Sequence, residues 1–482
     1  MPDFLKHVMV MLSGAVFAQL IPMLIAPVLT RLYSPAQFGV FSSVVALAGI
    51  LSVIVTLRFD LAIVLPKERK EAANLVGLAA GCATILSVVL WGVGFVISVV
   101  WPDLSILKSL GVWWQAVPLL TLLIALQQTI MFFANREKQY RTIATGNILL
   151  QLVVAFVAIA LGLMASSMSW LNGLVVARLL GFVVCVATIY QLTRNFWKEY
   201  RHLIDSFSLR ATAVTYRRFP FFNVPYSLAG VFSREFLVLA LTSVSQLIAA
   251  GHYGFARLIL NAPINFLTAA LSQVFYREAA ASVGSAVFRR FILRLMVLFA
   301  FGLAPLFALG ACWAQFIFIR LFGPEWEESG RFVAMLMPIA LLSVFTSWPE
   351  RLFEVRGRQR LALTIQLTFD ATSVIGVMLL LLDGHSATQA IGFYIVVQFV
   401  YQLCYLFAIF ELAELFKKQY CLLLFILFIG GAGIVVMHIV LGYFYSPNYY
   451  LLLLEAILAI TMAAGSSYYV NKHFNKHFWS NE

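Results

Sequence analysis

Long apolar runs separated by short polar connections follow one another along nearly the whole chain. About fourteen of these runs reach the roughly 20 residues that an α-helix needs to cross a lipid bilayer. A backbone inside a bilayer must satisfy its own hydrogen bonds, so runs of this length predict membrane-spanning helices. The predicted spans cover residues 10–30, 38–65, 72–100, 112–134, 143–165, 170–192, 220–246, 252–275, 292–319, 332–353, 361–382, 388–410, 421–443 and 449–470.

Basic residues mark every second connection between the predicted spans, and this alternation orients the chain. Connections rich in Lys and Arg face the cytoplasm by the positive-inside rule, so both chain ends are expected there. Few of the 33 Lys and Arg fall elsewhere: Arg31, Lys108, Arg320 and Arg331 lie in the opposite connections, and Arg58, Arg178, Arg234 and Arg257 lie inside spans.

The composition agrees with this pattern, since 62% of the 482 residues are hydrophobic and only 11% are charged. The short connections leave no room for a sizeable soluble domain, which excludes functions that need a large catalytic head. The net charge of +12 does not indicate a nucleic-acid partner, because the cations lie beside the spans rather than in one solvated patch. The predicted fold class is all-α, a polytopic protein of a phospholipid membrane.

No residue pattern indicates a catalytic group, a metal site or a cofactor. The five cysteines are scattered and never form a C-x-x-C pair, so they predict neither a disulfide framework nor metal ligands. The chain contains no G-x-x-x-x-G-K-[ST] loop, so direct ATP hydrolysis is not expected. We therefore expect a protein that is not an enzyme and that draws any energy from ion gradients or from consumption of its product.

The longest hydrophilic stretch, residues 194–219, divides six predicted spans from the remaining eight. It predicts an N-terminal lobe (1–193), a cytoplasmic connector (194–219), a C-terminal lobe (220–416), and two further helices with a cytoplasmic tail (417–482). A short internal similarity accompanies the division, because Phe38-Gly39 and Tyr253-Gly254 each open the helix that follows a short outer turn. Repeated halves around a central site are typical of transporters.

Polar residues inside the spans are the candidate functional groups, since a charge within a bilayer costs several kcal/mol unless it has a partner or a wet cavity. The eighth predicted span carries a polar face, and the seventh carries a similar one. Such faces can line an aqueous cavity, or they can join neighbouring helices. The candidates for binding cargo on these two faces are Arg257, Asn261 and Asn265 on the eighth span, and Arg234 and Asn223 on the seventh.

Arg58 and Arg31 are further cationic candidates, each with an interfacial alternative. Arg58 lies near the cytoplasmic end of the second span, where a long side chain can reach the interface. On a continuous helix it is rotated about 200° from Asp60, so the two are not expected to pair closely. Arg31 lies at the outer end of the first span, where an interfacial position is equally ordinary.

Acidic residues within spans are candidates for ion coupling. Asp370 in the eleventh span, Glu235 in the seventh and Asp60 in the second can each carry a proton or bind a cation. The alternative is a local salt bridge to a nearby Arg. The twelfth span carries Gln398, Gln402 and several Tyr, which can contact sugars or join helices.

The N-terminal region resembles a known family in several specific residues. They are Gln19, Pro22, the run Thr30-Arg31-Leu32-Tyr33-Ser34-Pro35, the pair Phe38-Gly39, and Arg58-x-Asp60-x-Ala62-Ile63. This stretch is similar to the bacterial polysaccharide transporters, the Wzx-type O-antigen and capsule-unit flippases of the multidrug/oligosaccharidyl-lipid/polysaccharide (MOP) exporter superfamily. The C-terminal half resembles the family in its pattern of spans more than in particular residues.

The resemblance implies a V-shaped pair of six-helix lobes with two extra C-terminal helices in a bacterial inner membrane. It implies carriage of undecaprenyl-pyrophosphate-linked oligosaccharides from the cytoplasmic to the periplasmic leaflet by alternating access, with or without ion coupling. The polysaccharide polymerase and the chain-length regulator are candidate partners. Functional cations on the first, second, seventh and eighth helices are also implied.

Two other classes of protein remain as alternatives. A drug/cation antiporter of the same superfamily usually carries a cationic cargo, which two Arg in the cavity would repel. A membrane polysaccharide polymerase or ligase needs a sizeable outer loop with catalytic groups, and the outer connections here are short.

Overall fold

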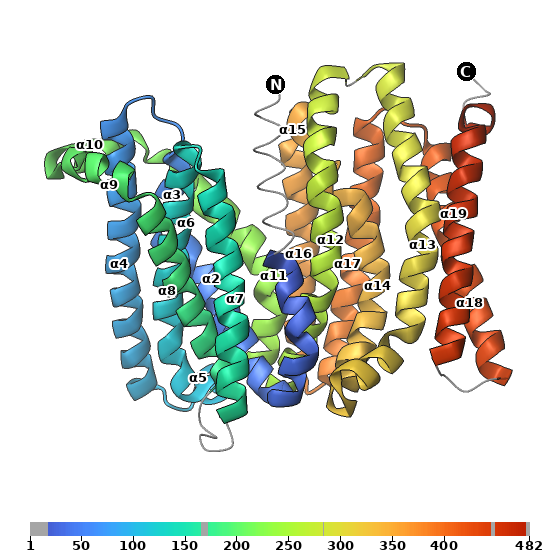
Figure 1. The fold of residues 1–482 in the computed structure, drawn as a ribbon, viewed down its shortest axis with the longest axis horizontal. Helices are drawn as coiled ribbons and strands as arrows, with labels where there is room; N and C mark the ends of the chain where they lie inside the picture. Colours follow the sequence, from blue (N-terminus) through green and yellow to red (C-terminus); the bar gives the residue numbers. More distant parts are fainter. Residues whose placement is uncertain (1–17, 165–171, 283, 445–448, 479–482) are drawn as a thin grey trace. The chain divides into compact units, whose positions relative to one another are not determined.

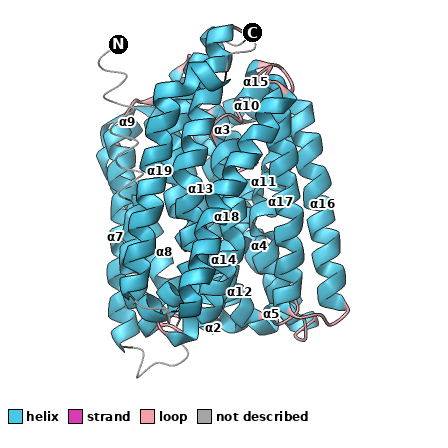
Figure 2. Cartoon of the chain, turned by 90° about the vertical axis from the view of Figure 1, so that its right-hand side faces the viewer, coloured by secondary structure: helices cyan, strands magenta, loops and turns pink. Residues whose placement is uncertain are grey.

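The computed structural model describes residues 18–164, 172–282, 284–444 and 449–478. These residues form helices joined by loops, and Figure 2 shows no strand among them. The helices labelled in Figure 1 are α2 (Pro35–Val55), α3 (Phe59–Ala62), α4 (Arg69–Val100), α5 (Ser105–Leu110), α6 (Ala116–Arg136), α7 (Tyr140–Met164), α8 (Gly173–Leu192), α9 (Arg194–Tyr200), α10 (Ser206–Thr215), α11 (Val224–Ser243), α12 (Leu247–Ser282), α13 (Ala286–Phe322), α14 (Glu327–Ser347), α15 (Leu352–Val355), α16 (Gln359–Leu382), α17 (Ala387–Leu412), α18 (Lys417–Phe444) and α19 (Tyr449–Phe478).

Eleven helices in the described part of the chain are long and apolar enough to cross a membrane. Two shorter apolar helices, Ala18–Leu32 and Tyr449–Gly465, accompany them. The all-α, polytopic fold class is therefore confirmed, whereas the number of about fourteen spans stays a prediction. Part of the first predicted span, residues 10–17, lies outside the described residues.

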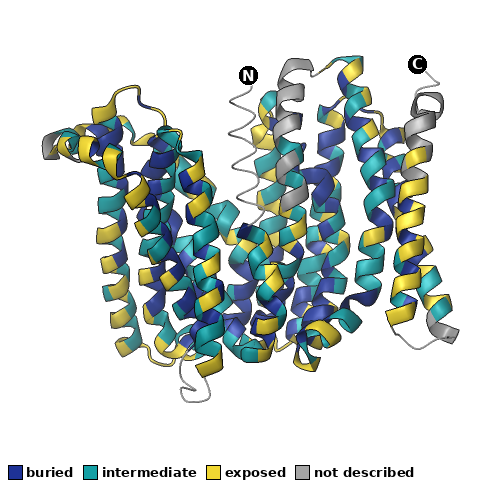
Figure 3. Ribbon diagram, in the orientation of Figure 1, coloured by how far each residue is buried: buried dark blue, intermediate teal, exposed yellow. Residues whose placement is uncertain are grey.

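Apolar side chains on the outer faces of several helices are exposed, as a bilayer requires. α4 is the clearest example in Figure 3, where exposed positions run along its length. Ile85, Val88, Trp91 and Phe95 are each about half exposed or more on this helix. Exposed apolar surface of this extent is unfavourable in water and favourable against lipid chains.

The chain forms two compact units, each with its own core. The first comprises Met1–Phe255 and Leu381–Ala387, and the second comprises Ala256–Leu380 and Thr388–Glu482. α12 begins in the first unit and continues in the second. The predicted connector is helical in α9 and α10, and α10 packs on α4 within the first unit. The predicted lobe boundaries stay a prediction.

The residues that carry the N-terminal resemblance build the start of α2. Ser34 caps the helix by accepting from the Gln37 backbone amide, and the Gln37 side chain accepts from the Ser34 amide, while Pro35 occupies the first turn. The Tyr33 hydroxyl donates to the Ala158 carbonyl of α7 at 2.7 Å. Asn172, at the start of α8, donates to the Gln37 carbonyl at 2.8 Å. This motif therefore fixes three helix ends rather than forming a reactive site.

The two aromatic-glycine pairs lie where α2 meets the first turns of α12. A Cβ atom on Gly39 would overlap the Leu247 carbonyl oxygen, and one on Gly254 would overlap the Ser42 hydroxyl of α2. Gly251, one turn earlier on α12, is as tightly placed, since its Cβ would overlap the Pro35 carbonyl oxygen. The Phe38 and Phe255 rings pack edge to face, with centroids 5.4 Å apart. Small residues allow helix backbones to approach this closely inside membranes. The repeated pattern in the sequence thus marks a tight helix crossing within the first unit.

In the second unit a buried carboxylate joins three helices. Glu455 of α19 is fully buried and accepts a 2.6 Å hydrogen bond from the Trp313 indole of α13. His438 of α18 lies 3.1 Å from the same carboxylate. Glu455 therefore has a packing role in the second unit.

Candidate functional site

The second predicted span does not continue as one helix. α2 ends at Val55, the short helix α3 begins at Phe59, and the residues between include Leu57 and Arg58 with φ of 47° and 59°. Left-handed backbone costs residues other than glycine about 1–3 kcal/mol, so the surrounding structure must hold this turn in place. Such turns are frequent at functional sites, where the backbone conformation sets the direction of a side chain.

This break brings Arg58 and Asp60 together. The Arg58 Nη1 atom lies 3.7 Å from Asp60 Oδ2, and the Asp60 side chain is fully buried. The expectation that these two residues cannot pair closely is wrong, because it assumed a continuous helix. A buried carboxylate without a cation would be strongly destabilising, so the Arg58 guanidinium offsets part of the cost of burying Asp60.

Arg234 supplies a second guanidinium beside this pair. It lies on α11, which packs along α2, and its positive charge acts on Arg58 in opposition to the charge of Asp60. The residue is exposed, and its Nε donates to the Gly230 carbonyl at 3.2 Å. We refer to Arg58, Asp60 and Arg234 as the cation cluster, since it holds two guanidinium groups and one buried carboxylate.

The other candidates of the first unit lie around this cluster or apart from it. Asn223 is partly exposed and ends a π-helical turn, Phe219–Asn223, that contacts α3. Glu235 follows Arg234 on α11 and is partly exposed. Arg31 is exposed at the end of the helix Ala18–Leu32. The structure places the predicted cations Arg58 and Arg234 in electrostatic contact with each other.

The remaining predicted cargo residues belong to the second unit. Arg257, Asn261 and Asn265 follow one another at four-residue intervals on α12, so they share one helix face as expected. Asn261 and Asn265 are exposed and Arg257 is partly exposed. Pro263 lies inside this helix and removes one of its backbone hydrogen bonds.

Asp370 and the polar residues of α17 also lie in the second unit. Asp370 is partly exposed on α16, and its charge acts on Tyr401 of α17. Gln402 accepts from the Thr346 hydroxyl of α14 at 2.6 Å, and Gln398 donates to the Ser373 hydroxyl of α16 at 3.4 Å. These two Gln therefore join α17 to its neighbours, which favours the packing alternative for them.

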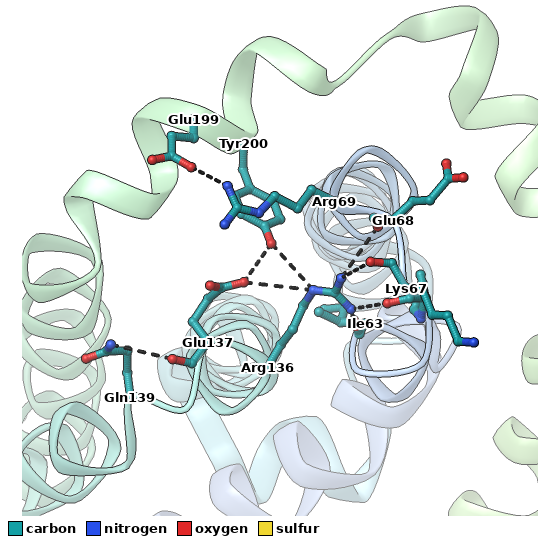
Figure 4. A network of polar contacts seen from close by, with 10 residues as sticks. Ile63, Lys67, Glu68, Arg69, Arg136, Glu137, Gln139, Glu199 and Tyr200 are labelled. Atoms are coloured by element: carbon teal, nitrogen blue, oxygen red, sulfur yellow. Dashed lines mark hydrogen bonds and ion pairs between the residues drawn. The ribbon is translucent and has the colours of Figure 1, made fainter.

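A polar network that was not predicted from the sequence lies near α9 in the first unit. Figure 4 shows it around Arg136, the last residue of α6. The Arg136 guanidinium donates to the backbone carbonyls of Ile63, Pro66, Lys67 and Glu68. The Tyr200 hydroxyl donates to Glu137 at 2.6 Å, and burial, together with this bond, raises the pKa of Tyr200.

A cavity of about 410 Å³ adjoins this network. Its lining residues are Val64, Lys67, Arg69, Asn135, Arg136, Glu137, Lys138, Tyr140 and Tyr200. From the sequence alone, the Lys and Arg of this cavity indicate only the orientation in the membrane. The cavity itself could not be predicted, because residues from three separate connections approach one another only in the fold. We refer to it as the basic pocket.

Comparison with known protein families gives one match that covers more than half of the chain. The family described as "Polysaccharide biosynthesis protein" matches residues 4–277. This range includes the N-terminal motif, the cation cluster and the first half of α12. The match confirms the family resemblance drawn from the N-terminal residues. No curated protein matches the chain in sequence.

Solved structures share the fold at very low identity. The chain is similar to the lipid II flippase MurJ in an inward closed conformation, with a TM-score of 0.71, 9% identity, and coverage of 98% of this chain and 100% of that one. A MOP superfamily transporter from Pyrococcus furiosus matches with a TM-score of 0.47, 13% identity, and coverage of 87% and 96%. The similarity to MurJ shows the fold of the chain, and the family match together with the apolar helices identifies a multi-pass membrane protein.

Proposed function

Because the chain belongs to the polysaccharide biosynthesis protein family, we propose that it is a flippase for lipid-linked oligosaccharides. The cargo is an undecaprenyl-pyrophosphate-linked repeat unit of an O-antigen, capsule or exopolysaccharide. The protein moves this unit from the cytoplasmic to the periplasmic leaflet of a bacterial inner membrane by alternating access. Both chain ends lie in the cytoplasm, as the distribution of Lys and Arg predicts.

The cation cluster is the observation that carries this proposal. A pyrophosphate brings about two negative charges into a medium that rejects them, and guanidinium groups replace its water with paired hydrogen bonds. A left-handed turn sets the position of Arg58, whose guanidinium lies 3.7 Å from the Asp60 carboxylate. Arg234 lies exposed on the neighbouring helix. A net positive charge held within the membrane suits an anionic head group that must bind and then leave.

The polar residues of the second unit extend the same role. Within that unit, Arg257 offers a guanidinium suited to a phosphate, and Asn261 and Asn265 on the same helix face offer hydrogen bonds to a phosphate or a sugar. Asp370, Glu235 and Asp60 are the groups through which a proton or a cation would couple to transport. Arg31 and Asn223 complete the proposed set of cargo residues.

A cationic drug fits this arrangement less well than an anionic head group does. Arg58 and Arg234 would repel a cation, and only one fully buried carboxylate, Asp60, lies beside them. The proposed partners are the polysaccharide polymerase and the chain-length regulator, since they act on the repeat unit after it is flipped.

Deletion of the gene tests the proposal in the cell. Lipid-linked repeat units should accumulate on the cytoplasmic leaflet, and surface polysaccharide should fall, because the units are complete but cannot cross. The measurement is lectin or antibody labelling of the surface, with extraction and mass analysis of the undecaprenyl-linked pool. Normal surface polysaccharide with no accumulated units in the deletion strain would contradict the proposed function.

A further inference from the structure

We propose that the basic pocket of the first unit binds the phosphate group of an anionic phospholipid at the cytoplasmic interface. This site is distinct from the cation cluster, and the inference does not depend on the identity of the cargo. It rests on the geometry of the pocket, on its charge and on its position at the ends of membrane spans.

Arg136 makes the pocket rigid. Its guanidinium donates to four consecutive or near-consecutive carbonyls in the segment that joins α3 to α4, so this segment is tied to the end of α6. Figure 4 shows the guanidinium enclosed by these carbonyls and by Tyr200. Arg136 therefore holds the backbone at Lys67 in place, and it is a positioning residue rather than a direct ligand.

The charge available to a ligand comes from Lys67 and Lys138. Both side chains are exposed or partly exposed on the pocket wall, and among the described residues neither forms an ion pair within 4.0 Å. Arg69, by contrast, is engaged with Glu199 at 2.7 Å. The Glu137 carboxylate accepts a hydrogen bond from Tyr200 and lies 3.9 Å from Arg136 Nε, so its charge is balanced by Arg136 within the network.

In the turn between α6 and α7, the backbone of Lys138 adopts a left-handed conformation. Lys138 has a φ of 56°, a left-handed conformation that residues other than glycine seldom adopt. Its amide donates to the Asn135 carbonyl at 3.0 Å, and the Gln139 amide donates to Ala134 at 2.8 Å, so the turn is well bonded. These bonds form the ordinary left-handed cap that ends α6, and the cap fixes the backbone of Lys138 beside the pocket.

The position of the pocket selects a lipid rather than a soluble anion. α4 begins at Arg69, α6 ends at Arg136 and α7 begins at Tyr140, so the pocket lies where three apolar spans meet the interface. Val64 lines it, and Val64 and Leu65 are 39% and 58% exposed, which offers an apolar surface for an acyl chain beside the cations. Basic pockets on the cytoplasmic side of spans are suited to anionic lipid head groups.

Native mass spectrometry of the purified full chain with phosphatidylglycerol tests the proposal. The double variant Lys67→Gln/Lys138→Gln should bind this lipid about 10–30-fold more weakly, since each Lys near an anionic head group contributes substantially to affinity. The matched control is Lys417→Gln/Lys418→Gln, which removes the same charge from exposed residues in the first turn of α18 and should leave the affinity unchanged. The variant Lys67→Arg/Lys138→Arg keeps the charge and should retain binding.

Two further molecules distinguish the possible ligands: phosphatidylcholine tests whether net charge is needed, and inorganic phosphate tests whether free phosphate binds in place of a lipid. Phosphatidylcholine, which has the phosphate but no net charge, should bind equally weakly to wild type and to the Gln variant. Millimolar inorganic phosphate should not displace phosphatidylglycerol from the wild type. Equal phosphatidylglycerol affinity in the wild type and a folded Gln variant would overturn the proposal, as would displacement by inorganic phosphate.

Discussion

Arg58→Ala is expected to reduce transport of the lipid-linked unit about 10- to 100-fold, because hydrogen bonds to a charged partner contribute about 1.5–3 kcal/mol. Arg58 is the cation whose position the structure determines most closely, through the left-handed turn and the contact with Asp60. Arg58→Lys keeps the charge but loses the paired donors of the guanidinium, so it should also fall well below wild type. Flipping by purified variants in liposomes measures both effects.

A loss of activity in Arg58→Ala has a second possible cause, since Asp60 would be left buried without its cation. Breaking a buried pair in this way costs about 3–5 kcal/mol of stability. The double variant Arg58→Gln/Asp60→Asn removes both charges and keeps the shapes similar. If Arg58 contacts the cargo, this double variant should be stable yet inactive. Recovery of wild-type transport in the double variant would show that Arg58 serves only to neutralise Asp60.

Two further variants complete this experiment. Arg234→Ala should lower transport with little change in the unfolding temperature, because Arg234 is exposed and substitutions of exposed residues usually change stability little. Arg141→Ala removes an exposed Arg at the start of α7, outside the cation cluster, and should behave as wild type. Equal transport by Arg234→Ala and Arg141→Ala would remove Arg234 from the proposed site.

Gly251→Ala is expected to destabilise the folded protein by about 3 kcal/mol or more, the upper end of what overpacking costs. The added Cβ would overlap the Pro35 carbonyl oxygen and press on the Gly39 amide, and neither backbone group can turn aside as a flexible side chain could. The crossing of α2 with the start of α12 would then have to open. Thermal unfolding in detergent, read together with the amount of protein in the membrane, measures this loss.

Gly49→Ala is the matched control for this substitution. Gly49 lies on α2 as well, but a Cβ there would meet nothing within 4 Å. Alanine favours a helix over glycine by about 0.5–1 kcal/mol, so this variant should be as stable as wild type or slightly more stable. Similar unfolding temperatures for Gly251→Ala and Gly49→Ala would mean that the helix crossing is not tight.

The features that sequence predicted well are those encoded locally. Hydropathy alone predicts apolar helices, and the span predicted from residue 38 begins at Pro35, where Ser34 caps the helix. Gly39 and Gly254, the glycines of the two aromatic-glycine pairs, lie in one crossing of α2 with α12. Arg58 and Arg234 lie near each other in the fold, and their role in binding cargo stays a prediction.

The features that sequence could not give depend on distant residues or on backbone detail. Predicting the Arg58–Asp60 contact would have required knowing that Leu57 and Arg58 form a left-handed turn, and neither residue type favours that conformation. The Arg136 network joins residues more than sixty positions apart, so each appeared as an ordinary basic flank. Hydropathy likewise gave no sign that Glu455 and Trp313 would meet.

Flipping by the purified protein in liposomes tests the central claim most directly. An undecaprenyl-pyrophosphate-linked oligosaccharide is placed in both leaflets, and a membrane-impermeant glycosidase outside digests whatever it can reach. With wild-type protein, digestion should proceed beyond the half that the outer leaflet holds, whereas empty liposomes and Arg58→Ala should stop near that half. Folded wild-type protein that gives the same extent of digestion as empty liposomes would contradict the account.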